Sequence, residues 1–133
     1  MKKQKMLDQM AAVTAAQYLR EHAKIKPVLD QEARLRGQLT KLKEHVATTR
    51  AQAEDDHSMK ALGADLLWQG WSTRKRRELN TELAQATAKK LMAMDRLRRS
   101  FGRKTALEGM AAEERQRRKV KQAKALEERL LSL

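Results

Sequence analysis

The chain of 133 residues contains no cysteine. This absence excludes a disulfide framework and any chemistry that depends on a thiolate. The sequence also lacks an apolar run long enough to cross a bilayer, and the basic first residues are not followed by the apolar core of a signal peptide. We therefore expect a soluble cytoplasmic protein without a transmembrane segment.

Helix breakers and aromatic residues are scarce as well. The chain has one proline, five glycines, two tryptophans, one tyrosine and one phenylalanine, too few aromatic side chains to fill a thick globular interior. Charged residues make up 35% of the sequence, a composition found both in disordered chains and in long helices. Because the apolar residues are periodic, the sequence favours long helices.

The first half of the chain contains a heptad seam, in which apolar or small residues recur at alternating spacings of four and three. Such spacing keeps the seam on one side of a helix. A looser apolar stripe precedes it, and Pro27 lies between the two, where we expect a kink or a break because proline lacks a backbone N–H. The seam contains Leu35, Leu39, Leu42, Val46, Thr49 and Ala53, and the looser stripe contains Met6, Met10, Val13, Leu19 and Ala23.

Polar residues and a glycine then interrupt the periodicity. An acidic run at 54–56 is followed by Ser58 and Gly63, and either Ser58 or Asp65 is a candidate N-cap for the next helix. We therefore predict an all-α fold, a long antiparallel two-helix coiled-coil hairpin that forms a single domain over residues 1–133. Its first arm is expected at about 6–54, the turn at about 55–65 and the second arm at about 66–131. The apolar positions of the second arm are Leu67, Trp71, Leu79, Leu83, Ala86, Leu91, Met94, Leu97, Phe101, Leu107, Met110 and Val120.

A turn centred near residue 60 predicts which residues of the two arms face each other. Apolar residues then meet apolar residues in five pairs, Met10 with Met110, Val13 with Leu107, Tyr18 with Phe101, Ile25 with Met94, and Leu29 with Leu91. Residues after about 119 have no counterpart in the first arm. We expect this tail, which contains Leu126, Leu130, Leu131 and Leu133, to project past the hairpin and to offer apolar surface to a partner.

The residue types that catalysis or metal binding requires do not cluster in the sequence. His22, His45 and His57 lack the paired spacing of a metal site, and the acidic run at 54–56 lacks the alternating ligands and central glycine of a calcium loop. The sequence also has no glycine-rich phosphate loop and no nucleophile elbow. We therefore predict a non-enzymatic protein with no catalytic residue, cofactor or metal.

The two tryptophans are the first candidates for an interaction site. Trp68 and Trp71 are three residues apart and therefore lie on one helix face, directly after the turn. They could staple the end of the hairpin against Ala53, or they could form an exposed anchor, since tryptophan is enriched among residues that dominate binding energy. The sequence leaves both interpretations open.

The positive charge of +13 is concentrated in the second arm. Residues 57–133 contain 19 basic and 9 acidic side chains, whereas residues 1–56 contain 11 and 8. The basic residues are distributed around the helix, without the basic region next to a zipper that enters a DNA major groove. They could form a solvated surface, or Arg96, Arg99 and Arg103 could bind an acidic or polyanionic partner.

The layout of the chain resembles the FliJ family of flagellar type III export proteins and the YscO-type proteins of virulence secretion. The resemblance depends on an antiparallel hairpin, a tryptophan-containing start of the second helix, an aromatic residue followed by basic residues some thirty positions later, and a polar extension. The corresponding segments are Trp68-Gln69-Gly70-Trp71, Arg99-Ser100-Phe101-Gly102-Arg103-Lys104 and Glu113-Glu114-Arg115-Gln116-Arg117-Arg118.

This resemblance implies a central stalk that enters the pore of a hexameric export ATPase, couples it to the membrane export gate and recycles export chaperones. On this interpretation the end with Met6, Met10, Met110 and the tail residues Leu126 and Leu130 engages the ATPase, and the tryptophan end meets a second component. Two other classes remain open, a basic helical nucleic-acid-associated protein and a scaffold coiled coil that associates peripherally with a membrane.

Overall fold

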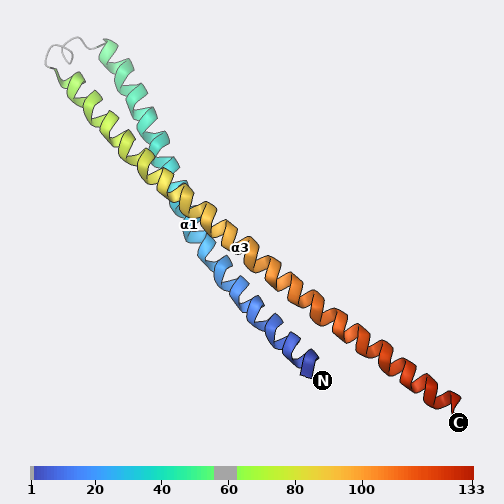
Figure 1. Cartoon of the computed structure of the whole chain (residues 1–133). Helices are drawn as coiled ribbons and strands as arrows, with labels where there is room; N and C mark the ends of the chain where they lie inside the picture. The colour runs from blue at the N-terminus through green and yellow to red at the C-terminus, as the bar shows by residue number, and fades with distance from the viewer. Residues whose placement is uncertain (1, 56–62) are drawn as a thin grey trace. The chain divides into compact units, whose positions relative to one another are not determined.

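The computed structural model describes residues 2–55 and 63–133, which form two long helices (Figure 1). Helix α1 spans Lys2–Asp55 and helix α3 spans Ala64–Leu131. The two helices pack against each other antiparallel, and the described residues contain no strand. The predicted all-α hairpin is therefore confirmed, with arms that begin slightly earlier than expected.

The packing divides the chain into two units. The terminal unit comprises residues 1–24 and 94–133, and the middle unit comprises residues 25–93. Each unit contains one segment of α1 and one of α3.

The middle unit contains the apolar core that the heptad seam predicts. Leu35, Leu39 and Leu42 from α1 are buried against Leu79 and Ala86 from α3, with Val46 and Leu83 packed beside them. Burying a leucine side chain contributes about 1.5–3 kcal/mol, so these residues supply most of the apolar stabilisation of this unit. Ala53, the last residue of the predicted seam, has a side chain outside the described set.

The terminal unit has a more polar seam than expected. Its buried residues include Leu7 and Ala111, but also Gln4, Thr14 and Ser100. The Gln4 side-chain amide donates to the Ala111 carbonyl oxygen at 3.3 Å and to Asp8 Oδ1 at 2.9 Å. The side-chain N–H groups of the buried glutamine are thus satisfied, one of them across the two helices, whereas its Oε1 has no partner among the described residues.

Several apolar residues that we expected inside α3 are exposed. The helix buries Ser100 instead of Phe101 and Ala111 instead of Met110, one position away in each case. One residue turns the side chain by about 100° around the helix, so the large neighbours lie on the flank of the seam while small residues occupy it. The exposed members of the expected apolar positions are Leu67, Trp71, Leu91, Met94, Phe101, Met110 and Val120, of which Val120 lies beyond the part of α3 that we expected to be paired.

Helix α1 continues through Pro27, so the expected break is absent. A proline inside a helix costs about 3 kcal/mol, because it removes one backbone hydrogen bond and crowds the preceding turn. The ring of Pro27 is exposed, and the partly buried Ile25 and Val28 on either side belong to the seam. Packing of these neighbours offsets the local cost and keeps the helix intact.

Helix α3 begins directly after a glycine in a left-handed conformation. Gly63 has φ of 69°, which glycine adopts without the steric cost that a Cβ adds, and its carbonyl oxygen accepts the Leu67 N–H at 3.3 Å. Asp65 therefore lies within the first turn and is not the N-cap that we expected. Its negative charge still favours the helix N-terminus. The other candidate, Ser58, lies outside the described residues.

Candidate interaction surfaces

The tryptophan pair lies at the start of α3, in the middle unit. The Trp68 and Trp71 rings stack with their centroids 5.1 Å apart and their planes 20° from parallel. Trp68 lines a hollow of about 260 Å³ together with Leu42 and Val46 of α1, and its buried ring N–H has no acceptor among the described residues. Trp68 thus packs toward α1, in keeping with a staple.

Trp71 is the outer ring of the stack and is 46% exposed. It lines a second hollow of about 280 Å³ with Lys41, His45 and Lys75. An exposed indole beside cationic side chains has the character of a protein-binding anchor. The staple interpretation therefore suits Trp68, and the anchor interpretation suits Trp71. Binding of a partner by Trp71 remains a prediction.

Arg96, Arg99 and Arg103 recur at spacings of three and four on α3, and all three are exposed. Arg99 forms an ion pair with Asp95 at 3.0 Å, within one helix. In the described part of the chain, no ion pair forms at Arg96 or Arg103. The terminal unit contains 17 basic and 8 acidic residues, a net charge of +9. This unit therefore holds most of the positive charge of the chain.

An aromatic cluster joins the two helices of the terminal unit. The rings of Tyr18 and Phe101 have centroids 5.7 Å apart, which confirms the predicted pairing of these residues. The His22 ring is tilted by 45° against the Tyr18 ring, with centroids 5.9 Å apart, and Lys104 Nζ lies 5.6 Å from the Tyr18 ring centre. The other predicted pairs have no such direct contact to test them, although Val13 and Leu107 line one common hollow.

The seam of the middle unit contains an ionic cluster that our sequence analysis missed. Glu32 is buried, and its carboxylate lies 2.8 Å from Lys90 Nζ on α3 and 2.8 Å from Arg36 Nε on the same helix. Hydrogen bonds from Lys90, and then from Arg36, hold the pKa of Glu32 below its ordinary value. The signal was present, because Glu32 continues the four-three spacing that precedes Leu35 and Leu39.

Within residues 2–55 and 63–133, no helix packs against the last part of α3. Every residue from Lys119 to Leu133 is exposed, and Leu126 and Leu130 are 58% and 63% accessible. Figure 1 shows this segment, coloured red, continuing past the N-terminus of α1. The expected projection of an unpaired tail is confirmed.

No family model, curated protein or solved structure matches the chain. Among the described residues, no helix is long and apolar enough to cross a membrane. The described side chains also include no group of three or more His, Asp or Glu residues placed to hold a metal ion. Three exposed surfaces are candidates for binding a partner. They are the Trp71 ring, the arginines Arg96, Arg99 and Arg103, and the tail of α3.

Proposed function

We propose that the protein is a non-enzymatic, cytoplasmic stalk of a type III protein export apparatus, which binds a hexameric export ATPase. The observation that carries the proposal is the tail of α3, because it extends a two-helix hairpin by more than three helical turns with no helix to cover its leucines. An apolar helix end of this kind favours contact with another protein. The resemblance to the FliJ family supplies the identity of that protein.

The tail provides the chemistry that such a contact requires. Leu126 and Leu130 are four residues apart and lie on one side of the helix, in a segment that contains three basic residues, Lys121, Lys124 and Arg129, and two acidic ones, Glu127 and Glu128. A single helix within a ring of six identical subunits cannot match their symmetry. We therefore expect few, tolerant apolar contacts with flanking charges rather than a deeply complementary interface.

The other surfaces are available to further components of the apparatus. Trp71 and the three arginines Arg96, Arg99 and Arg103 precede the tail along α3 and are exposed. They therefore remain accessible when the tail is bound. We assign them to the export gate and to export chaperones. In this scheme the hairpin links the components to one another and catalyses no reaction of its own.

Truncation after Val120 tests the proposal. The deleted residues make no described contact with α1, so circular dichroism and the melting temperature should change little, whereas stimulation of the export ATPase should be lost. A matched control replaces the exposed Leu66 and Leu67 with serine, which removes similar apolar surface near the other end of α3. Full stimulation by the truncated protein, or equal loss in the control, would contradict the assignment of the tail.

The net charge of the terminal unit favours a second candidate function, non-specific binding of nucleic acid. A surface that neutralises several phosphates releases counterions, so its affinity falls steeply as salt rises. A pull-down from lysate with and without nuclease separates the candidates. Protein partners that remain after nuclease treatment support the stalk, and partners that disappear support the nucleic-acid alternative.

A further inference from the structure

In the terminal unit, each helix carries a second stripe of residues, which lies beside the residues that are buried between the helices. On α1, residues recur at spacings of four and three from Met6 to Lys24, and on α3 a similar stripe extends from Arg96 to Met110. Their side chains are mostly exposed although they include several methionines. The α1 stripe contains Met6, Met10, Val13, Gln17, Arg20 and Lys24, and the α3 stripe contains Arg96, Arg99, Arg103, Ala106 and Met110.

The α1 stripe borders a shallow hollow that reaches α3 at Leu107, beside the α3 stripe. Met6, Met10 and Val13 line it from α1, and Leu107 lines it from α3, around a volume of about 280 Å³. Leu107 is four residues after Arg103 and three before Met110, so both lie next to it on the helix surface. The hollow therefore joins the two stripes into one face, which we call the Met-Arg face.

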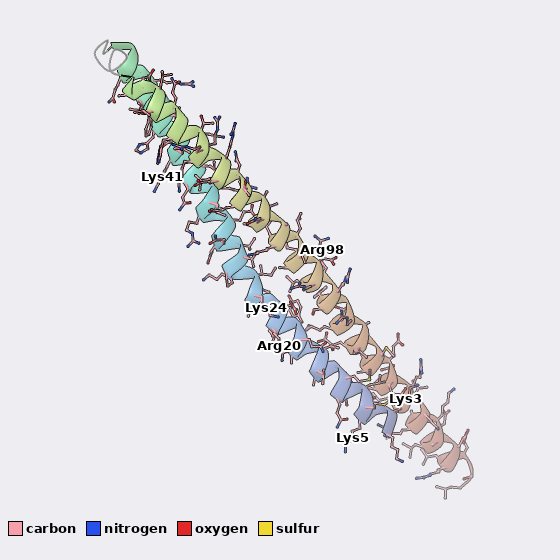
Figure 2. All side chains as sticks on the ribbon, turned by 60° about the vertical axis from the view of Figure 1, so that its left-hand side comes forward. Lys3, Lys5, Arg20, Lys24, Lys41 and Arg98 are labelled. Carbon is pink, nitrogen blue, oxygen red and sulfur yellow. The ribbon has the colours of Figure 1, made fainter. Side chains whose placement is uncertain are left out.

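Apolar and basic side chains occupy different parts of this face. Met6, Met10 and Val13 precede Arg20 and Lys24 along α1, and Figure 2 shows the latter two on successive turns. Because α3 is antiparallel, its arginines lie toward the same end of the unit as Arg20 and Lys24, and Met110 lies toward the methionines of α1. The face is thus apolar at one end and positively charged at the other.

We propose that the Met-Arg face docks an amphipathic helix of another protein as the third helix of a bundle, and that this helix is acidic. A groove between two packed helices accepts a third helix whose apolar residues recur at spacings of three and four. Charge complementarity selects the occupant, since carboxylates on the helix pair with the arginines. A second copy of this chain does not fit, because its terminal unit carries the same charge of +9.

The methionines predict how selective the site is. Their unbranched, polarisable side chains adapt to apolar residues of different shapes, and Met-rich surfaces accordingly accept several partners. Charge, rather than the exact apolar sequence, is therefore expected to decide which helices bind.

Methionine methyl groups provide a direct test on the full chain. We would label them with carbon-13 and titrate a synthetic helical peptide of about 20 residues, with leucine at coiled-coil core positions and glutamate elsewhere. The signals of Met6, Met10 and Met110 should shift, and that of Met94, which lies on the opposite side of α3 from Arg96 and Arg103, should not. The matched peptide with lysine in place of glutamate should cause no shift. Shifts that spread evenly over all methionines, or equal binding of the lysine peptide, would overturn the proposal.

Two sets of variants test the location of the site. The triple variant Arg96→Glu, Arg99→Glu and Arg103→Glu should weaken peptide binding at least about ten-fold, because it reverses the charge that selects the helix. The control Arg74→Glu, Arg76→Glu and Arg77→Glu makes the same charge change in the middle unit and should alter binding less than about two-fold. Equal weakening by both would show non-specific attraction.

Val13→Ser tests the apolar part of the face without any change of charge. This side chain is exposed, so the variant should fold normally and bind the peptide more weakly; unchanged binding would overturn the proposal. Duplex DNA and phosphatidylserine vesicles form the competing arms of the titration. If either shifts the same three methyl groups at a lower concentration than the acidic peptide does, the face recognises that ligand and the proposal fails.

Discussion

At the scale of single residues, the most informative group is the carboxylate of Glu32. It lies within the seam and interacts with a lysine from the other helix and an arginine from its own. A buried charge of this kind costs desolvation free energy, which its partners offset only when the geometry is retained. We therefore expect the cluster to favour one alignment of α1 with α3 in the middle unit, because leucine contacts are more easily exchanged for one another.

The lowered pKa of Glu32 predicts how stability depends on pH. Its pKa in the folded chain lies below the ordinary value of 4.5, so the unfolded chain takes up a proton first as the pH falls. The contribution of Glu32 should be complete above about pH 4.5 and should be lost as the pH falls through the folded value. Urea unfolding at several pH values would measure this effect as the difference between the native chain and Glu32→Gln. A difference that stays constant from neutral pH to pH 3 would contradict the account.

Gly63 and Gly37 predict opposite effects of the same substitution. Alanine at Gly63 should lower the free energy of unfolding by about 1–2 kcal/mol, because L-residues at positive φ are strained. Alanine at Gly37 should raise it by about 1 kcal/mol, since this glycine lies inside α1 and an added Cβ meets only open space. Denaturant titrations of the two variants would measure both changes. Stabilisation by Gly63→Ala would show that the turn does not require the left-handed conformation.

At the scale of helices, the heptad spacing predicted the packing well where the seam is apolar and poorly where it is polar. The leucines at 35, 39 and 42 are buried as predicted. Near Ser100 and Ala111, the prediction assigned the larger apolar neighbours, Phe101 and Met110, to the buried seam. It failed because hydrophobicity alone does not reveal that closely packed helices require small side chains there.

The candidate surfaces could be predicted only in part. Spacing sufficed for the unpaired tail, since its residues have no counterpart in α1. It could not assign separate roles to Trp68 and Trp71, because residues three apart share a helix face and only packing shows which ring is covered. The Met-Arg face was missed because its methionines were expected to pack inward.

Crosslinking within the terminal unit tests the antiparallel alignment. Cysteines at Val13 and Leu107 line one hollow and should be joined within a single chain by a short bifunctional maleimide. The control pair, Val13→Cys with Val120→Cys, places the second cysteine about 20 Å further along α3 and should react poorly. Gel electrophoresis separates products within and between chains. Crosslinks found only between chains would indicate a parallel or exchanged dimer.

At the scale of the whole molecule, most of the net charge and the leucine core belong to different parts of the chain. The terminal unit carries a net charge of +9 and the unpartnered tail, whereas the middle unit contains the leucine core and the tryptophan pair. Surface charges contribute little to stability but strongly affect encounter with a partner. This division suits a protein whose stability and binding properties depend on different residues.

The central claim is that one copy of this chain serves a ring of six ATPase subunits. Native mass spectrometry of the full chain mixed with a hexameric export ATPase tests it most directly, because it counts the chains in each complex. We predict one chain per hexamer, and no complex when the chain is truncated after Val120, since a central pore admits a single hairpin and the tail supplies the contact. Six chains per hexamer, or a complex that survives the truncation, would contradict the account.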